Sequence, residues 1–187
     1  MANRKYSDGP AASINSSDVE SSQEAKFGLL STDRGDGDSL LGAEYEVFLN
    51  FRGPDTRLNF TDCLYHAMDG AGIRVFRDNE EMRKGEAIKG ELERAIKSSA
   101  ICIPIFSRNY TSSAWCLREL TYMVDCKAMI LPIFFDVEPK DVKLKTNFYQ
   151  DALQRHKEKF SCEDVQRWEE ALVKVAHMKG WDVKDTG

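Results

Sequence analysis

The chain has 187 residues, of which 26 are basic and 31 acidic, so its formal net charge is −5 at pH 7. Chains of this length usually fold as one domain, and 42% apolar residues exclude a wholly disordered protein. No run approaches the roughly 18 apolar residues of a membrane span, and the five cysteines include no CxxC pair. We therefore expect a cytoplasmic or nucleo-cytoplasmic protein without a membrane contact, a disulfide framework or a metal site. The mild acidity disfavours nucleic acid as a partner.

The first quarter of the chain has a different composition from the rest. Residues 1–44 carry four basic and eight acidic side chains, whereas residues 45–187 carry 22 and 23. The first segment is rich in Ser, Gly and Asp, and it lacks the apolar surface that would offset the entropy cost of ordering it. We expect a flexible, disordered leader at residues 1–43, one folded domain at 44–183 and a tail at 184–187.

The folded part alternates between two kinds of pattern. Short, continuously apolar runs predict buried strands at residues 45–51, 73–76, 100–106 and 129–135. Apolar residues at helical spacing predict helices from Asp55 or Thr56 to Gly70, through Ile88–Ile96, after Ser112 or Ser113, near Phe148–Lys159 and over Glu163–Lys179, the last stopped by Gly180.

Strands that are apolar throughout, and that alternate with helices, are typical of a parallel sheet covered on both faces. We therefore predict an α/β fold of the flavodoxin-like, doubly wound type, with a five-stranded parallel sheet flanked by helices. The fifth strand is expected either near Val142 or at Trp181–Val183. Ligands of such sheets bind beyond the carboxyl ends of the strands, so the informative loops follow Phe51, Phe76, Phe106 and Phe135.

The loop after the first strand carries two arginines, Arg52 and Arg57, beside the start of a helix. It is neither a GxGxxG nor a Walker A loop, but arginines at a helix N-terminus can hold an anionic ligand. Alternatively, Arg57 pairs with a carboxylate on the surface. The charged loop at Asp78–Gly85 is either simply solvated or a mobile lid with Gly85 as its hinge.

The loop after the third strand leads into a helix on which Trp115 and Glu119 are four residues apart and share a face. Leu117 and Leu120 mark the apolar stripe of that helix, and we expect Trp115 and Glu119 to point well away from it. Trp115 then either packs under a neighbouring loop or forms a stacking platform beside the Glu119 carboxylate. We expect His156 and His177 to lie on helix surfaces.

Several motifs occur together and in order: YEVFLNFRGPDTR, GIRVFRD, MRKGEAI, ELERAI, SRNYTSSAWCLREL and LPIFFDVEPKDV. They resemble the plant type of Toll/interleukin-1 receptor (TIR) domain found in intracellular immune receptors. The resemblance covers residues 43–182. It implies a five-stranded parallel sheet and an enzyme that self-associates with other TIR domains. Many plant TIR domains cleave NAD+ or NADP+ at the nicotinamide–ribose bond, so the dinucleotide is a substrate and no cofactor is expected.

The resemblance also implies roles for individual residues. Glu119 corresponds to the catalytic glutamate of the family and Trp115 to the aromatic residue of the same motif. The nucleotide-contacting residues correspond to Phe51, Arg52 and Gly53. The mobile loop corresponds to Asp78–Ile88, with Arg83 as a substrate contact and Lys84 and Gly85 beside it.

Three regions of the chain depart from the family pattern or bear on self-association. Asp62 and Cys63 stand where many relatives carry Ser-His on the first helix, which puts that contact between domains in doubt. Asn50 stands where serine is usual. Lys179, Gly180 and Trp181 match a second region of contact between domains, although they also fit a helix stop followed by a packed tryptophan.

A lone carboxylate suits this reaction, because nicotinamide leaves as a neutral base and needs no general acid, unlike the leaving group of an ordinary glycosidase. A fixed anion can then stabilise the positive, oxocarbenium-like ribose. One hypothesis is therefore an NAD+ glycohydrolase that signals plant innate immunity and cell death. The alternative is a catalytically weak TIR adaptor or decoy that acts by homotypic binding.

Overall fold

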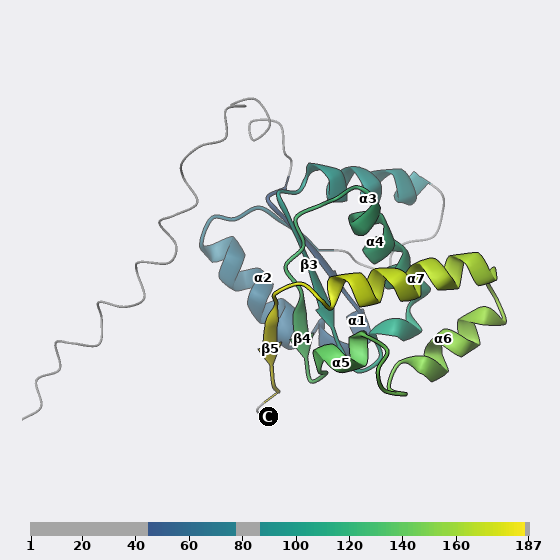
Figure 1. Ribbon diagram of the computed structural model, residues 1–187. Coiled ribbons are helices and arrows are strands. Elements are labelled where there is room, and N and C mark those ends of the chain that lie inside the picture. The colour runs from purple at the N-terminus through teal and green to yellow at the C-terminus, as the bar shows by residue number, and fades with distance from the viewer. Residues whose placement is uncertain (1–44, 78–86, 186–187) are drawn as a thin grey trace, which may run out of the picture. The chain divides into compact units, whose positions relative to one another are not determined.

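The computed structural model describes residues 45–77 and 87–185, with side chains described from residue 90 onward in the second range (Figure 1). The predictions for residues 1–43 and for Arg83, Lys84 and Gly85 lie outside the described residues. The strands are β1 Val47–Phe51, β2 Val75–Arg77, β3 Ile101–Phe106, β4 Ile133–Phe135 and β5 Trp181–Val183. The helices are α1 Gly53–Thr56, α2 Phe60–Gly70, α3 Ala87–Ser98, η3 Tyr110–Ser112, α4 Ala114–Asp125, α5 Pro139–Val142, α6 Gln150–Lys157 and α7 Cys162–Val175.

The strands form one parallel sheet in the order β2-β1-β3-β4-β5. This confirms the flavodoxin-like prediction, including a fifth strand at Trp181–Val183. The alternative position near Val142 is wrong, because Val142 ends the short helix α5. β1 is paired along its length with β3, from Val47 opposite Ile101 to Phe51 opposite Ile105. On its other side β1 pairs with β2, from Val47 opposite Val75 to Leu49 opposite Arg77, so β1 is an interior strand.

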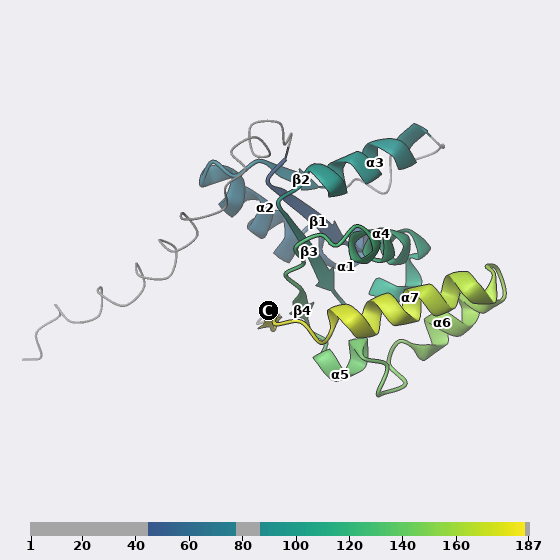
Figure 2. The same ribbon diagram turned by 45° about the horizontal axis from the view of Figure 1, so that its top comes forward.

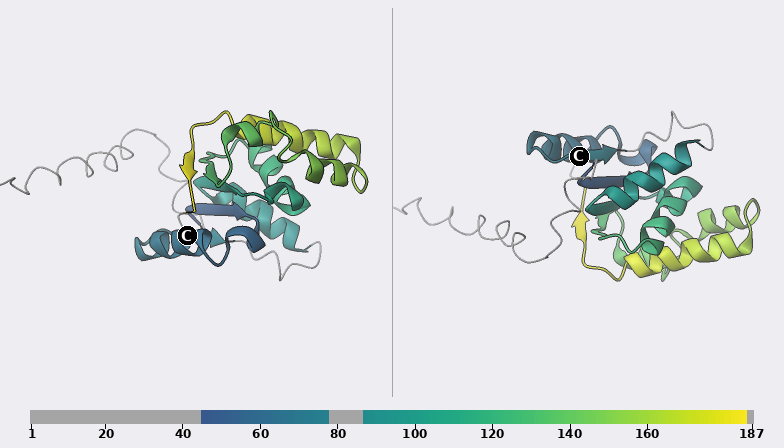
Figure 3. Two further views of the ribbon diagram at one scale, coloured as in Figure 1. Left: turned by 90° about the horizontal axis from the view of Figure 1, so that it is seen from below. Right: turned by 90° about the horizontal axis from the view of Figure 1, so that it is seen from above.

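Helices cover both faces of the sheet. Among the described elements, α2 lies on one face, and α3, α4 and α7 lie on the other (Figures 1 and 3). Because side chains alternate along a strand, Leu49 and Phe51 of β1 face α2, while Phe48 packs into the core beneath α3, α4 and α7. Burial on both faces explains why these strands are apolar throughout.

Two predicted helix ends are wrong, because the sequence offered several polar residues or glycines that could serve as ends. Neither Asp55 nor Thr56 caps α2; the cap is Asn59, whose Oδ1 accepts a hydrogen bond from the Phe60 N–H at 2.6 Å. The last helix, α7, ends at Val175, well before Gly180.

Gly180 lies just before the edge strand β5, where the chain approaches β4 closely. The Trp181 N–H donates to the Pro132 carbonyl at 3.0 Å. A Cβ atom on Gly180 would collide with that same Pro132 oxygen and would lie 2.9 Å from Cε2 of Phe134. Glycine is needed here because the backbone must pass so near its neighbour.

Asp55 ties two loops together at the carboxyl edge of the sheet. Its carboxylate accepts hydrogen bonds from Arg52 Nη1 at 2.5 Å, from Ser107 Oγ at 2.7 Å and from the Asn109 backbone N–H at 2.8 Å. Burial by itself raises the pKa of Asp55, but the hydrogen bonds from Ser107 and Asn109 and the charge of Arg52 outweigh it, so the pKa is lowered. The carboxylate thus joins the loop after β1 to the loop after β3.

Substitution of Gly180 by alanine should lower the free energy of unfolding by about 1–3 kcal/mol, because the added methyl group overpacks the junction between β4 and β5. Urea unfolding measures this change. Gly90→Ala is the matched control: nothing lies within contact distance of its added Cβ, and alanine in a helix should raise stability by about 0.5–1 kcal/mol. Equal effects of the two substitutions would contradict the close approach.

Substitution of Asp55 by asparagine should lower the free energy of unfolding at pH 7 by about 1–2 kcal/mol, a value reduced because solvent screens the Arg52 pair. Since the folded pKa of Asp55 is lowered from 3.8, its contribution is present above pH 3.8 and disappears as the pH falls through the folded pKa. Urea titrations at pH 7 and pH 3 should therefore show a difference that shrinks in acid.

The control for Asp55 is Asp62→Asn. The pKa of Asp62 is also lowered, mainly by the hydrogen bond from Arg77, but this pair lies at the surface and should contribute little. A loss at Asp55 that stays constant between pH 7 and pH 3 would show that its charge is not what holds the two loops.

Candidate functional site

The candidate catalytic residue, Glu119, lies on α4, whose start is fixed by Ser113. The Ser113 hydroxyl accepts a hydrogen bond from the Cys116 N–H at 3.2 Å, as an N-cap residue does. α4 then runs between α3 and α7 and over the sheet (Figure 2). The prediction that Glu119 points well away from the core is wrong, because its side chain is only 3% exposed. A helix enclosed on three sides buries the flanks of its apolar stripe as well as the stripe itself.

A groove with a volume of about 280 Å³ crosses α4 between α3 and α7, and Trp115 and Glu119 both line it. Trp115 is partly buried and packs against the core, so it both closes the core and contributes an aromatic surface to the groove. Leu92 and Ile96 of α3 and Trp168 of α7 add further apolar lining. The volume is close to the lower limit of roughly 300 Å³ for small-molecule sites, so the groove suits one end of a dinucleotide better than the whole.

The polar lining of the groove carries both signs of charge. Glu93 and Asp164 contribute carboxylates, and Arg118 contributes a guanidinium group that lies over the ring of Phe160, 5.2 Å from its centroid. Arg167 also lines the groove and pairs with Asp125 at 2.5 Å. Arg118 lies on α4 and Arg167 lies on α7, and guanidinium groups at these positions could bind a phosphate.

Glu119 reaches the sheet through Asn50, the fourth residue of β1. The Asn50 Nδ2 donates to Oε2 of Glu119 at 2.7 Å, and Asn50 is completely buried. This contact was not expected from the sequence. The signal that could have revealed it is one amide residue within the otherwise apolar strand Val47–Phe51, because a buried amide requires a polar partner.

The three residues expected to contact the nucleotide after β1 lie in different surroundings. The Phe51 side chain is 2% exposed and belongs to the core on the α2 face. The Arg52 side chain is 25% exposed and pairs with Asp55 at 2.5 Å, which directs its guanidinium group along the carboxyl edge. Gly53 is buried at the start of α1. The structure thus brings Arg52 to the edge and holds Phe51 in the interior.

Arg57 does not extend into solvent as a surface side chain would. Its guanidinium group lies over the Phe51 ring, 5.3 Å from the centroid. A Cβ atom on Gly53 would lie 2.8 Å from Nη2 of Arg57. Gly53 is therefore the residue that allows Arg57 to pack against β1.

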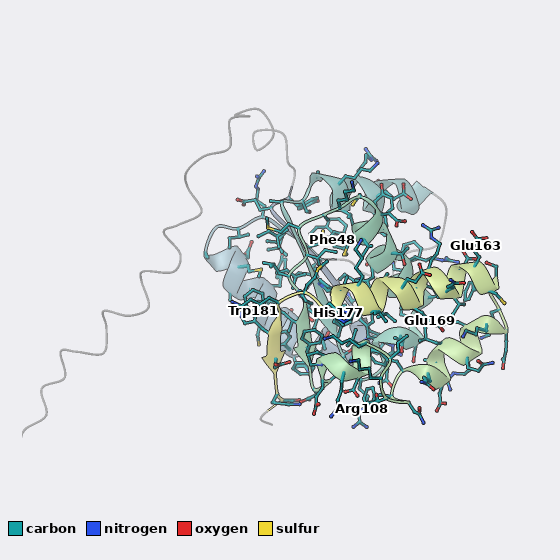
Figure 4. The ribbon with its side chains drawn as sticks, viewed as in Figure 1. Phe48, Arg108, Glu163, Glu169, His177 and Trp181 are labelled. Carbon is teal, nitrogen blue, oxygen red and sulfur yellow. The ribbon has the colours of Figure 1, made fainter. Side chains whose placement is uncertain are left out.

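The residues expected to mediate self-association lie on two separate surfaces. On α2, Asp62 pairs with Arg77 at 2.6 Å and Cys63 is exposed. At the other edge of the sheet, Lys179 is exposed, and Trp181 is 55% exposed on β5 (Figure 4). The alternative in which Trp181 is a packed residue is wrong, because β5 is an edge strand and leaves this ring open to solvent.

One histidine also differs from expectation. His156 is 9% exposed, and its Nε2 lies 2.9 Å from the Thr111 carbonyl, with the ring against Phe160 and Trp168. The prediction of a surface position is wrong, because α6 packs its polar face against η3. His177 is exposed, as predicted. In residues 45–77 and 90–185, no group of three or more His, Cys, Asp or Glu side chains is placed to hold a metal ion.

The helices of the domain are short or carry many charged residues. Within the part of the chain that the structure describes, none combines the length and the apolar character that a bilayer crossing requires.

Comparison with known proteins gives a consistent result. The TMV resistance protein N of Nicotiana glutinosa is 41% identical over 142 residues, which is 73% of this chain and 12% of the relative. The disease resistance protein RPV1 of Vitis rotundifolia is 41% identical over 145 residues, which is 75% of this chain and 10% of the relative. This chain therefore spans only about a tenth of the length of these curated relatives.

A shorter relative and a solved structure match more of their own length. A probable 2′ cyclic ADP-D-ribose synthase, BdTIR of Brachypodium distachyon, is 35% identical over 149 residues, which is 78% of this chain and 64% of the relative. The TIR domains in the structure of the activated Roq1 resistosome, described as directly recognizing the pathogen effector XopQ, superpose with a TM-score of 0.67. The two sequences are 38% identical, and the match covers 74% of this chain and 87% of the resistosome TIR chain.

The fold, the buried glutamate on α4 and these relatives agree with a match of the whole described region to one family. The profile of the TIR domain matches residues 44–187. The chain therefore belongs to the TIR domain family.

Proposed function

We propose that this TIR domain self-associates and cleaves NAD+ or NADP+ to nicotinamide and an ADP-ribose-type product. The observation that carries the proposal is the Glu119 carboxylate, which is 3% exposed, lines the groove beside Trp115 and is hydrogen-bonded from below by Asn50. A buried acid that lines a groove is a strong candidate for a reactive group, because electrostatic interactions are larger where water is excluded.

The chemistry needs only one carboxylate. The bond between C1′ of the ribose and the nicotinamide nitrogen breaks, and its electron pair goes to the nitrogen, so nicotinamide leaves as a neutral base. The ribose carbon becomes positively charged, and the Glu119 carboxylate stabilises that charge. A water molecule then attacks C1′ and loses one proton, which gives ADP-ribose; attack by a group of the substrate itself gives a cyclic product instead.

Different parts of the carboxyl edge of the sheet would hold the two ends of the dinucleotide. Trp115 offers an aromatic face for the nicotinamide end, and the volume of about 280 Å³ limits what the groove can enclose. Arg52 and Arg118 are proposed as phosphate contacts, because Arg52 lies at the carboxyl edge and Arg118 lines the groove. Arg83 of the loop at residues 78–88 is proposed as a further contact, outside the described residues.

The relatives support the biological setting of the proposal. Resistance proteins of plants are similar to this chain, and a relative named as a probable 2′ cyclic ADP-D-ribose synthase suggests a cyclic product. A TIR assembly in an activated resistosome suggests that identical domains pack together. We propose signalling in plant innate immunity and cell death, in the cytoplasm, with other TIR domains as partners.

Substitution of Glu119 by glutamine should reduce the rate of nicotinamide release by at least about 100-fold, because the neutral amide cannot stabilise the cationic ribose. The purified protein is incubated with NAD+, and separately with NADP+, at high protein concentration with a crowding agent, and nicotinamide is quantified. Glu170→Gln is the matched control, since this exposed glutamate of α7 accepts a hydrogen bond from Gln166 Nε2 at 2.9 Å and does not line the groove. Equal release from the Glu119 variant and the unaltered protein would refute the role of Glu119.

A catalytically weak adaptor or decoy is the second candidate, and the surface of α2 favours it. Asp62 and Cys63 occupy the helix face where many relatives carry Ser-His, and Asp62 is engaged by Arg77. An unaltered protein that self-associates but releases no nicotinamide would support this candidate over the enzyme.

Substitution of Trp181 by alanine should weaken self-association and should lower activity most at low protein concentration. The ring is 55% exposed on an edge strand, so its loss removes an apolar contact surface without opening the core. Sedimentation velocity and activity are measured over a range of concentrations, with thermal unfolding as a check on the fold. Phe148→Ala, at another exposed aromatic residue, should leave both unchanged; an identical effect would refute a specific role for β5.

A further inference from the structure

Asn50 is a polar residue in an apolar place. It is completely buried within β1, between Leu49 and Phe51, which face α2. Alternation along the strand turns its side chain to the opposite face, toward α4. Burial of an amide without hydrogen-bond partners is costly in free energy, so the contacts of Asn50 decide whether the strand tolerates it.

The contacts of Asn50 use both ends of its amide. Its Nδ2 donates to Oε2 of Glu119 at 2.7 Å and lies 3.4 Å from the Cys116 carbonyl. Its Oδ1 accepts a hydrogen bond from the Tyr110 hydroxyl, and that hydroxyl also lies 3.3 Å from the Cys116 carbonyl. The opposite orientation of the amide would place its oxygen against the carboxylate, so Tyr110 and Glu119 together select one orientation.

We propose that Asn50 is a positioning residue that fixes the Glu119 carboxylate in one rotamer and holds it ionised. The proposal rests on the role proposed above for Glu119. A donor that points at a carboxylate favours its charged form, whereas burial alone favours the protonated form. At 3% exposure, Glu119 has little contact with water that would favour its charged form. The Asn50 amide, held within β1, supplies a hydrogen-bond donor instead.

The effect of Asn50 on Glu119 must be distinguished from the effects of other charged groups nearby. Glu93 of α3 and Asp164 of α7 line the same groove, as do Arg118 and the Asp125–Arg167 pair. On the sheet side, Cys102 of β3 has its pKa raised to about 12, first by burial, then by Cys126 and Glu119. None of these groups changes when Asn50 is replaced, so a comparison of variants isolates the amide.

Two buried tyrosines in the segments after β3 provide a matched pair. Tyr110 is 0% exposed and its hydroxyl orients Asn50. Tyr149 is 1% exposed and its hydroxyl donates to the Ser107 carbonyl at 2.6 Å. Replacement of either by phenylalanine deletes one buried hydroxyl group, but only the loss at Tyr110 releases the amide that contacts Glu119.

The experiment measures the titration of Glu119 directly in the full chain. The protein is labelled with ¹³C at the glutamate carboxyl groups, the Glu119 signal is assigned by its disappearance in Glu119→Gln, and its midpoint is followed with pH. In Asn50→Leu, which has a similar volume and no donor, the midpoint should rise by about one pH unit. Tyr110→Phe, the milder variant, should shift it less in the same direction, and Tyr149→Phe should not shift it.

Kinetics provide a second readout. If the titration midpoint of Glu119 rises by one pH unit, kcat for nicotinamide release should be about tenfold lower at a given pH on the acid limb of its pH profile. Activity should recover as the pH increases. KM should change less than kcat, since Asn50 lies behind the carboxylate and does not line the groove. A merely structural loss would lower activity equally at every pH.

Two results would overturn the proposal. One is a Glu119 midpoint in Asn50→Leu and Tyr110→Phe that equals that of the unaltered protein. The other is an equal shift in Tyr149→Phe, which would trace the effect to loosened packing. An unaltered protein that releases no nicotinamide refutes the proposed function instead, and the titration still decides whether Asn50 holds the carboxylate.

Discussion

The burial of β1 on both faces and along both edges is the constraint on which the rest of the structure depends. β1 pairs with β2 and β3, and helices cover each face of the sheet. No polar side chain on this strand can therefore be satisfied by water. Asn50 must find its partners inside the protein, and it finds them in Tyr110 and in Glu119. The same constraint that builds the sheet thus brings a carboxylate of α4 into contact with β1, an interior strand.

The carboxyl edge is assembled from segments that are distant in sequence. Asp55 joins the loop after β1 to Ser107 and Asn109 after β3, and Tyr149 reaches Ser107 from the segment before α6. These contacts hold the end of β1 and the start of α4 in a fixed relation. A groove bordered by Trp115 and Glu119 then gains its shape from α3 and α7. Pre-organisation of this kind places the main cost in folding, so the groove needs little reorganisation to receive a ligand.

Much of the fold could be predicted because its signals are local. Continuous apolar runs marked the strands, and the fifth strand at Trp181–Val183 was one of two expected positions. Helix ends were less predictable, since Asp55, Thr56 and Asn59 can each act as a cap and tertiary contacts choose among them. A motif and a resemblance singled out Glu119 as a candidate, whereas its burial was predicted wrongly, because helical periodicity describes one helix and not the helices beside it.

By itself, the sequence determined the class of fold and the family, because apolar periodicity and short motifs depend on residues near one another in the chain. Only the tertiary structure decided that Asn50 contacts Glu119 across 69 positions of sequence, that Asp55 links two loops and that Trp181 is exposed while His156 is buried. The physical reason is that hydrogen bonds and burial depend on which elements the fold brings together. The sequence pattern around a residue does not show which distant elements will pack beside it.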